Sequence, residues 1–364
     1  MKKIEIAIVF AFILIISSCS IDKTNKSDKL EDNEIKNVIL LIGDGMGVSQ
    51  VYSAMTVSLD TLNIERFKYI GFSKTYSINN YITDSGAGGT ALSTGKKTKN
   101  GYIAVDSSKK ALKTILEYAE DNNHATGLVA TSSIVHATPA SFISHYYKRS
   151  DYERLALDFL NTDIDIFIGG GRKSFAQRSD SLNLVDSLIK RNYDVFNNLD
   201  SMLANSNNIA VFTAEEHNPK YSEGRGDMLP DATEKAINFL KNRKNGFFLM
   251  VEGSQIDWGG HDNDVDYIVS EMIDFDKAIG KALDFAKKDK HTLVIITADH
   301  ECGGLSLNGG DIKKGIVEGA FTSDYHTAVM VPVFAYGPGA KEFIGIYENT
   351  AVFDKMMKAF KFEK

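Results

Sequence analysis

Residues 81–95, YITDSGAGGTALSTG, place one serine between an aspartate and a run of small residues. Ser85 lies where a helix is expected to begin, so its hydroxyl could cap that helix. The small neighbours also suit a second interpretation, in which Ser85 is a nucleophile kept clear of bulky side chains. The segment alone does not decide between these two interpretations.

Three carboxylates follow apolar runs that are typical of buried strands. Asp44 follows VILLIG, Glu252 follows FFLMV, and Asp299 follows LVIITA with His300 directly after it. Because the carboxyl ends of parallel strands share one edge of a sheet, these acids are expected to lie together. Each acid alone could cap a following helix. Three together would repel one another without a positive charge among them, which predicts a metal cluster.

Histidines supply further ligands of the kind that zinc prefers. Asp257 and His261 are four residues apart in VEGSQIDWGGHDND, so one helical turn would place both on the same face. An aspartate and a histidine arranged in this way can share one zinc ion. His326 lies just before the apolar run VPVFAYG. We interpret four other histidines as ordinary polar residues: His124, His145, His217 and His291.

The elements that position these residues follow from the hydrophobic pattern. Apolar, β-branched runs predict buried strands, and longer stretches between them predict helices. The alternation predicts an α/β fold with a doubly wound, mostly parallel central sheet and helices on both faces. The polar region 197–230 is expected at the surface. The predicted strands are 37–43, 125–131, 165–171, 247–253, 292–299 and 331–337, and the predicted helices include 111–122, 181–192 and 268–288.

Composition limits the class of protein and its partners. The chain has 364 residues, of which 43% are hydrophobic and 24% are charged, as is usual for a globular protein of one large domain or two. We expect one domain over residues 37–364. The net charge of −7 disfavours nucleic acid as a specific partner, because binding to a phosphate backbone requires a basic face.

The N-terminus has the pattern of an export signal. Lys2 and Lys3 precede an uncharged run over residues 6–16, which is too short to span a bilayer and fits the apolar part of a signal peptide over residues 1–18. Ser17 and Ser18 before Cys19 resemble a bacterial lipoprotein box, although the usual leucine and small residue are here Ile16 and Ser18. The resemblance implies a lipid on Cys19, and plain signal cleavage is the alternative.

Export has consequences for the start of the mature chain. Residues 19–36 are polar and are expected to form a tether. We expect a periplasmic or cell-envelope protein that is attached to a membrane through the lipid. If Cys19 carries lipid, Cys302 has no cysteine with which to form a disulfide.

Six motifs together resemble the alkaline phosphatase family, whose members are metal-dependent phosphomonoesterases with a doubly wound α/β sheet. The resemblance implies that small phosphate monoesters are substrates and that inorganic phosphate is a product. In chain order the motifs are LLIGDGMG, TDSGAGGTALSTG, HATPASF with Arg149 downstream, VEGSQIDWGGH, TADHECGG and HTAVMVPVFAYGPG.

The resemblance also implies roles for individual residues. Ser85 matches the nucleophile that forms a phosphoserine, and Arg149 matches the arginine that binds the phosphate. The implied cofactors are two zinc ions and a third ion, which is magnesium or another divalent ion. The implied ligands are Asp44, Asp299 and His300 for the zinc at the serine, Asp257, His261 and His326 for the second zinc, and Glu252, Thr138 and the shared Asp44 for the third ion.

Two residues depart from the best-known enterobacterial branch of the family, and one segment is shorter than in many members. His136 stands where that branch has an aspartate, which favours a zinc- or cobalt-like third ion over magnesium because imidazole is a softer ligand. Trp258 stands where that branch has a lysine; it either weakens product binding or simply packs. The insertion near 305–325 is short, whereas many members have a larger one that forms a second subdomain and part of the dimer contact. The resemblance therefore leaves open whether this chain forms a homodimer.

Three other functions share some of these features. A phosphodiesterase or nucleotide pyrophosphatase on the same metal core usually has a threonine nucleophile. A sulfatase carries its modified residue in a Cys/Ser-x-Pro-x-Arg context, whereas Ser85 is followed by Gly86-Ala87-Gly88. A non-catalytic lipoprotein that stores zinc or captures phosphate would have no need of a serine beside the metals.

Overall fold

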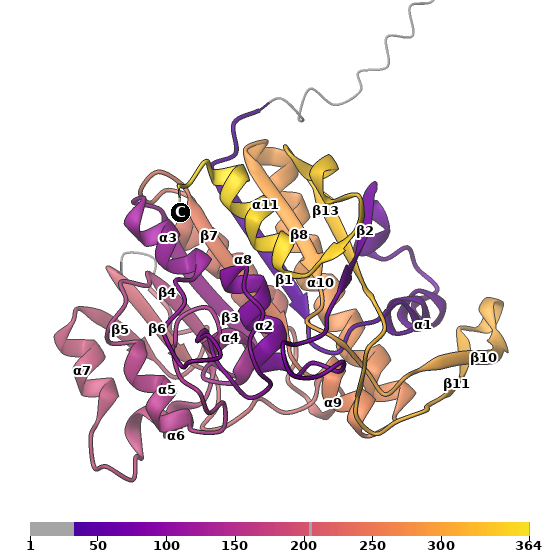
Figure 1. Cartoon of the computed structure of the whole chain (residues 1–364), viewed down its shortest axis with the longest axis horizontal. Coiled ribbons are helices and arrows are strands. Elements are labelled where there is room, and N and C mark those ends of the chain that lie inside the picture. Colours follow the sequence, from indigo (N-terminus) through magenta and orange to yellow (C-terminus); the bar gives the residue numbers. More distant parts are fainter. Residues whose placement is uncertain (1–32, 204–205, 364) are drawn as a thin grey trace, which may run out of the picture.

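A ten-stranded sheet forms the centre of the protein (Figure 1). The structure is a computed structural model that describes residues 33–203 and 206–363, so the predicted signal peptide and Cys19 lie outside the described residues. The strand order is β14-β2-β13-β8-β1-β7-β3-β4-β6-β5. These strands are β1 (Asn37–Gly43), β2 (Tyr69–Lys74), β3 (Ala125–Ser133), β4 (Ile166–Gly170), β5 (Tyr193–Phe196), β6 (Asn208–Phe212), β7 (Phe247–Gly253), β8 (Thr292–Thr297), β13 (Val331–Tyr336) and β14 (Gly345–Glu348).

Helices cover both faces of this sheet, as Figure 1 shows for α2 and α11 in front and α10 behind. The longer helices are α1 (Val48–Ser58), α2 (Ser85–Thr94), α8 (Met228–Leu240), α10 (Val265–Asp289) and α11 (Thr350–Phe360). The shorter ones are α3 (Ile115–Asp121), α4 (Ala137–Ala140), α5 (Tyr152–Asp158), α6 (Arg172–Ala176), α7 (Leu184–Lys190) and α9 (Ile256–His261), with 3-10 turns η1 (Asn63–Arg66), η2 (Tyr221–Glu223), η3 (Ile312–Lys314) and η4 (Ala340–Phe343).

Strand β1 shows how the two layers are built. Val38, Leu40 and Ile42 pack into one hydrophobic cluster, whereas Ile39 and Leu41 pack into the other. The first cluster includes residues of α2, α3 and α11, and the second includes residues of α1, α8 and α10. Because successive side chains of a strand point to opposite faces, a continuous apolar run is what a strand covered on both faces requires. The predicted fold class is confirmed.

One strand of the sheet runs against its neighbours. Strand β13 is antiparallel to both β8 and β2, which agrees with a sheet predicted to be mostly, not wholly, parallel. The chain leaves β8 at the carboxyl edge of the parallel strands and enters β13 from that same edge without a crossover helix, so it must run back.

One prediction about the sheet was wrong. The region 197–230 was expected at the surface, but it contains β6, whose residues Ile209, Ala210 and Val211 are fully buried.

Two small ladders lie outside the main sheet. Strand β9 (Glu301–Cys302) pairs with β12 (His326–Thr327), and β10 (Ser306–Asp311) pairs with β11 (Ile316–Ala320). The β10–β11 hairpin occupies the predicted insertion and projects from the body beside α1 (Figure 1). Among residues 33–203 and 206–363, no helix combines the length and the apolarity needed to cross a membrane.

Candidate active site

The carboxyl ends of β1, β7 and β8 bring the predicted acids together. Strand β1 pairs in parallel register with β7 and β8, and Ile42 lies opposite both Glu252 and Thr297. Asp44 and Asp299 follow directly beyond these strands, and all three carboxylates are fully buried. The described residues contain three groups of potential ligands whose ligand atoms lie within 4.8 Å of one another. These groups are named here the first, second and third clusters.

The first cluster consists of Asp44, Asp299 and His300. Nε2 of His300 lies 3.4 Å from Oδ1 of Asp44 and 3.3 Å from Oδ2 of Asp299. The same nitrogen lies 3.3 Å from Oγ of Ser85. The structure therefore brings the predicted nucleophile against the ligand set that the sequence associated with it.

Helix α2 holds Ser85 in this position. Asp84, not Ser85, caps the helix, because its carboxylate accepts a hydrogen bond from the backbone N–H of Ala87 at 2.9 Å. The cap interpretation of the Ser85 side chain was therefore wrong, and its hydroxyl is free for other chemistry. Ser85 is the first residue of the helix, where the helix dipole favours negative charge.

Glycines allow α2 to approach the first cluster. A Cβ atom at Gly88 would lie 2.9 Å from Cβ of Asp299, and one at Gly89 would lie 3.0 Å from Oγ of Ser141. Carbon atoms this close overlap, so a larger residue at Gly88 would push the helix away from Asp299. The small residues after Ser85 thus have a packing reason.

The second cluster consists of Asp257, His261 and His326, which were predicted, and Cys302, which was not. Nε2 of His261 and Nε2 of His326 each lie 3.4 Å from a carboxylate oxygen of Asp257. Nδ1 of His261 lies 2.7 Å from the backbone oxygen of Asp324, and Nδ1 of His326 lies 2.9 Å from that of Thr83. Such contacts orient a histidine so that Nε2 can bind a metal.

The third cluster consists of Asp44, Glu252 and His136. The hydroxyl of Thr138 donates to Oδ2 of Asp44 at 3.4 Å, so the predicted threonine lies beside this cluster. Glu252 accepts hydrogen bonds from the hydroxyls of Ser132 and Ser254. Sequence reasoning missed these two serines, because no pattern in the chain marks which hydroxyls meet a buried carboxylate.

Unpartnered polar atoms indicate that the clusters fit cations. Among the described residues, buried side-chain atoms without a hydrogen-bond partner include one oxygen each of Asp44, Glu252, Asp257 and Asp299, and one nitrogen each of His136 and His300. Buried polar atoms are otherwise almost always paired, so these six atoms need a partner. Oxygen and imidazole nitrogen donors in this mixture are typical of zinc and similar divalent ions.

The electrostatics of the first and third clusters point the same way. Burial, together with Asp299, raises the pKa of Asp44 well above its ordinary value. Burial likewise raises the pKa of Glu252 to about 7 and that of Asp299 to about 6. Burial also lowers the pKa of His300 to about 4, so its imidazole is neutral. Carboxylates that resist ionisation beside neutral imidazoles form a site that a cation would stabilise.

Arg149 and Trp258 flank the clusters. Nη1 of Arg149 donates to Oδ2 of Asp84 at 3.0 Å, and its Nη2 lies 3.4 Å from Nε2 of His136. Burial and the nearby Arg149 lower the pKa of His136 to about 3, so this imidazole is neutral as well. The Trp258 ring lies 6.3 Å from the His136 ring, measured between centroids.

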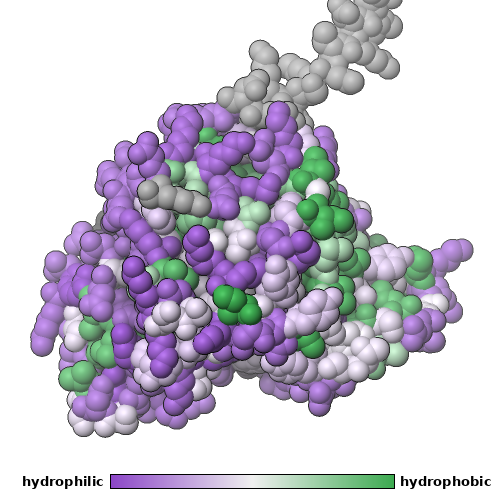
Figure 2. All heavy atoms as spheres, viewed as in Figure 1, coloured by the Kyte–Doolittle hydropathy of each residue, from purple (hydrophilic) through white to green (hydrophobic). Residues whose placement is uncertain are grey.

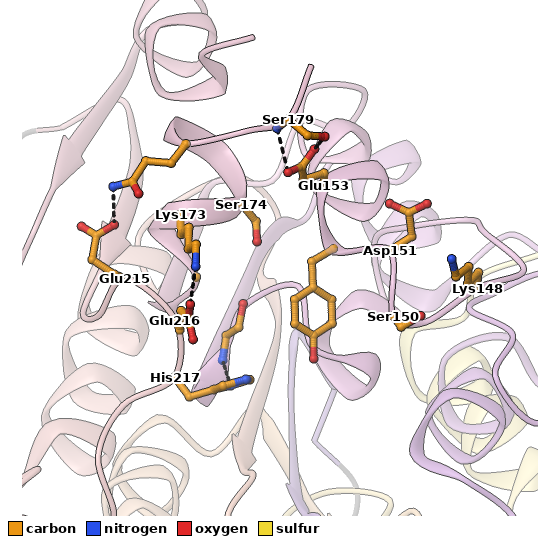
Figure 3. A pocket seen from close by; sticks show the side chains of 14 residues that line it. Lys148, Ser150, Asp151, Glu153, Lys173, Ser174, Ser179, Glu215, Glu216 and His217 are labelled. Carbon is orange, nitrogen blue, oxygen red and sulfur yellow. Dashed lines mark hydrogen bonds and ion pairs between the residues drawn. The ribbon is translucent and has the colours of Figure 1, made fainter. Parts of the chain in front are cut away.

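His217 lies closer to the site than its interpretation as an ordinary polar residue suggests. Its ring centroid is 4.9 Å from that of Trp258 and 5.8 Å from that of His136. Its Nδ1 accepts a hydrogen bond from the backbone N–H of Ser133. His217 also lines a neighbouring cavity of about 520 Å³, in which Lys173 pairs with Glu216 and Glu153 accepts from Ser179 (Figure 3).

Comparisons with known proteins agree with this geometry. A family model described as alkaline phosphatase matches residues 35–318. Alkaline phosphatase 3 of Bacillus subtilis (strain 168) is 36% identical, over 95% of this chain and 94% of its own length. Alkaline phosphatase of Escherichia coli (strain K12) is 30% identical, over 91% of this chain and 87% of its own length.

Solved structures extend the comparison to the fold. Alkaline phosphatase from the Antarctic bacterium TAB5 is 44% identical, with a TM-score of 0.87 over 91% of this chain and 99% of that one. A histidine-to-aspartate mutant of the TAB5 enzyme, solved with Mg bound in the M3 site, is 43% identical, with a TM-score of 0.86 and the same coverage of both chains. This chain therefore belongs to the alkaline phosphatase family.

Proposed function

We propose that this phosphatase hydrolyses small phosphate monoesters through a phosphoserine on Ser85, with two zinc ions and a third divalent ion as cofactors. The observation that carries the proposal is the position of the Ser85 hydroxyl, at the first residue of α2 and 3.3 Å from Nε2 of His300 in the first cluster. Asp44, Asp299 and His300 would hold the zinc ion nearest to Ser85. Asp257, His261 and His326 would hold the second zinc ion.

The residues of the chain have separate tasks in this reaction. Oγ of Ser85 forms a bond to phosphorus as the ester bond to the leaving alcohol breaks, and water then releases phosphate and restores the serine. Arg149 offers two N–H groups to phosphate oxygens, and Asp84 orients it. Backbone N–H groups at the start of α2 favour the negative charge of the phosphate. Divalent cations, when bound, stabilise the serine alkoxide and the leaving oxygen.

Chelation is expected to abolish hydrolysis of a chromogenic phosphate monoester, and added zinc is expected to restore it. The reason is that a serine hydroxyl is a weak nucleophile near neutral pH without a neighbouring positive charge. Metal analysis of the purified protein before and after dialysis against chelator measures the ions lost. Unchanged hydrolysis in excess chelator would contradict the proposal. A phosphodiester assayed in parallel separates the phosphodiesterase alternative, which requires the diester to be the better substrate.

We also propose that His136 directs the third cluster toward a zinc- or cobalt-like ion. His136 belongs to this cluster with Asp44 and Glu252, and imidazole is a softer donor than carboxylate. His136→Asp is therefore expected to shift the preference of this site toward magnesium. The magnesium-bound histidine-to-aspartate mutant of the TAB5 enzyme supports the design of this test. The ratio of magnesium to zinc retained after dialysis measures the shift, and an unchanged ratio would refute the role of His136.

We further propose export and a lipid on Cys19. The support is the sequence pattern alone: a basic start, an uncharged run and a cysteine after two serines. The mature protein purified from cell envelopes is expected to begin at residue 19 and to carry the mass of a lipid on its first residue. An unmodified N-terminal peptide in the mass spectrum would favour plain cleavage.

We propose that two copies of the chain form a homodimer through one side of the molecule that exposes apolar side chains. Exposed apolar side chains lie on α1, on the β10–β11 hairpin and on the edge strand β14, and Figure 2 shows green gathering on that side of the molecule. They include Val48, Tyr52, Ile312, Ile316 and Ile346. Exposed apolar side chains that gather on one side of a molecule often mark an interface. Light scattering of the purified chain, which should give the mass of two copies, checks the pairing.

A further inference from the structure

The second cluster contains a sulfur donor beyond the ligands proposed for zinc. One ligand atom from each of Asp257, His261, Cys302 and His326 lies within 4.8 Å of the others. Cys302 is fully buried and forms no disulfide, and Asp257 beside it carries a buried oxygen without a hydrogen-bond partner. The thiol therefore lies beside a carboxylate oxygen that has no hydrogen-bond partner.

The backbone fixes the position of this thiol. Cys302 lies directly opposite His326 in the β9–β12 ladder, and opposite residues of antiparallel strands place their side chains on the same face. The backbone N–H of Cys302 donates to the oxygen of Gly45 at 3.1 Å, and its oxygen accepts from Nε2 of Gln50 at 2.8 Å. Hydrogen bonds at both its N–H and its C=O thus hold the backbone of Cys302 in place.

Close packing limits where the sulfur can go. A Cβ atom at Gly45 would lie 3.0 Å from Cβ of Cys302, and one at Gly260 would lie 2.8 Å from it. A side chain at either position would therefore clash with Cys302 unless the backbone shifted. The backbones of Gly45 and Gly260 thus pack directly against Cys302 and limit its movement. One ligand atom from each of Asp257, His261 and His326 lies within 4.8 Å of the sulfur.

Ligand number decides what a sulfur donor does here. Two histidines and one carboxylate leave an open position on zinc, as catalytic zinc sites require. A fourth protein ligand closes that position. Thiolate is a soft ligand that binds soft cations most tightly. We propose that the second cluster also takes a thiophilic divalent cation such as Cd²⁺, held by Asp257, His261, Cys302 and His326 in a closed site that excludes the substrate oxygen.

Binding in this closed site forms a metal–sulfur bond, and the thiol proton passes to solvent. The cation displaces zinc without any change in oxidation state. The inference rests on the proposed function only in taking the second cluster as a zinc site. It makes this chain selectively sensitive to thiophilic ions through one residue, Cys302.

The test uses metal-free protein titrated with Cd²⁺ while the ultraviolet absorption of a cadmium–thiolate bond is recorded. The wild-type chain and Cys19→Ser are both expected to show this absorption. The chain has only two cysteines, so in Cys19→Ser the signal can come only from Cys302. Cys302→Ser is expected to lack the absorption and to lose at least about tenfold in preference for Cd²⁺ over Zn²⁺, measured by equilibrium dialysis.

The outcomes separate this inference from the proposed function. Cd²⁺ that binds to Cys19→Ser without a thiolate signal overturns the inference and leaves the zinc site intact. An unchanged preference in folded Cys302→Ser, checked by circular dichroism, also overturns it. A metal-free chain that binds neither Cd²⁺ nor Zn²⁺ overturns both proposals. Because Cys19→Ser reads the thiol directly, the result does not depend on how well Cys302→Ser folds.

Discussion

Ser85→Ala is expected to lower kcat for monoester hydrolysis by about 10⁴-fold or more, because the variant lacks the oxygen that forms the bond to phosphorus. The three clusters do not include Ser85, so zinc content and phosphate binding should stay close to the wild-type values. Steady-state kinetics with a chromogenic monoester measures the loss. Metal analysis and calorimetric titration with inorganic phosphate measure the two properties that should remain.

Ser93→Ala is the matched control for this experiment. Ser93 lies in the same helix and is buried, but its hydroxyl donates to the backbone oxygen of Ser141, away from the clusters. Its kcat should stay within a few-fold of the wild-type value. Retention of normal kcat in Ser85→Ala would contradict the nucleophile. A wild-type chain that binds phosphate without turnover would instead support the non-catalytic binder.

Asp44→Asn should have the second largest effect, because Asp44 belongs to both the first and the third clusters. Losing its charge weakens two cation sites together, and a stabilisation of about 4 kcal/mol lost from the transition state corresponds to a kcat lower by roughly 10³-fold. Metal analysis should show reduced occupancy of two ions per chain. Full metal content with normal kcat would refute the shared ligand.

Compared with wild type, Asp44→Asn should have a higher Tm without metal and a lower Tm with zinc. Burial and Asp299 raise the pKa of Asp44, so its ionised form is unfavourable in the metal-free folded protein and the substitution should raise Tm near pH 8. With zinc present, wild type should be the more stable protein, because ligand binding stabilises the folded state. Thermal denaturation in chelator and in zinc measures both differences.

Asp276→Asn provides the comparison for the stability experiment. Burial also raises the pKa of Asp276, but its carboxylate accepts hydrogen bonds from the backbone N–H groups of Asn63 and Ile64, outside the three clusters. Its substitution should lower Tm by a similar amount in chelator and in zinc. A metal-dependent change in Asp276→Asn would show that the reversal in Asp44→Asn is not specific to the site.

The central strands and the acids beyond them could be predicted from the sequence, because both signals are local. A continuous apolar run followed by an acid marks Asp44 and Asp299 without any knowledge of the fold. The spacing of Asp257 and His261 is local in the same way. Strand β6 was not predicted because its apolar run, IAVF, is short and lies in a polar region. Only pairing with β4 and β5 makes it part of the sheet.

Contacts that depend on long-range register could not be predicted. Cys302 joins the second cluster only because β9 pairs with β12 opposite His326. Asp84 caps α2 and binds Arg149 across 65 positions of the chain, which no local pattern encodes. Ser132 reaches Glu252 from the neighbouring strand β3, across 120 positions of the chain. His217 was underestimated for the same reason, since its neighbours come from three separate segments.

The order of the ligands along the chain has a consequence for biogenesis. The first cluster joins Asp44, near the beginning of the sequence, to Asp299 and His300, which lie toward its end. A polypeptide that emerges with its N-terminus first cannot assemble this ion site until almost all of it has been released. Cation capture is therefore among the last steps of maturation, and it locks together parts of the chain that were made far apart in time.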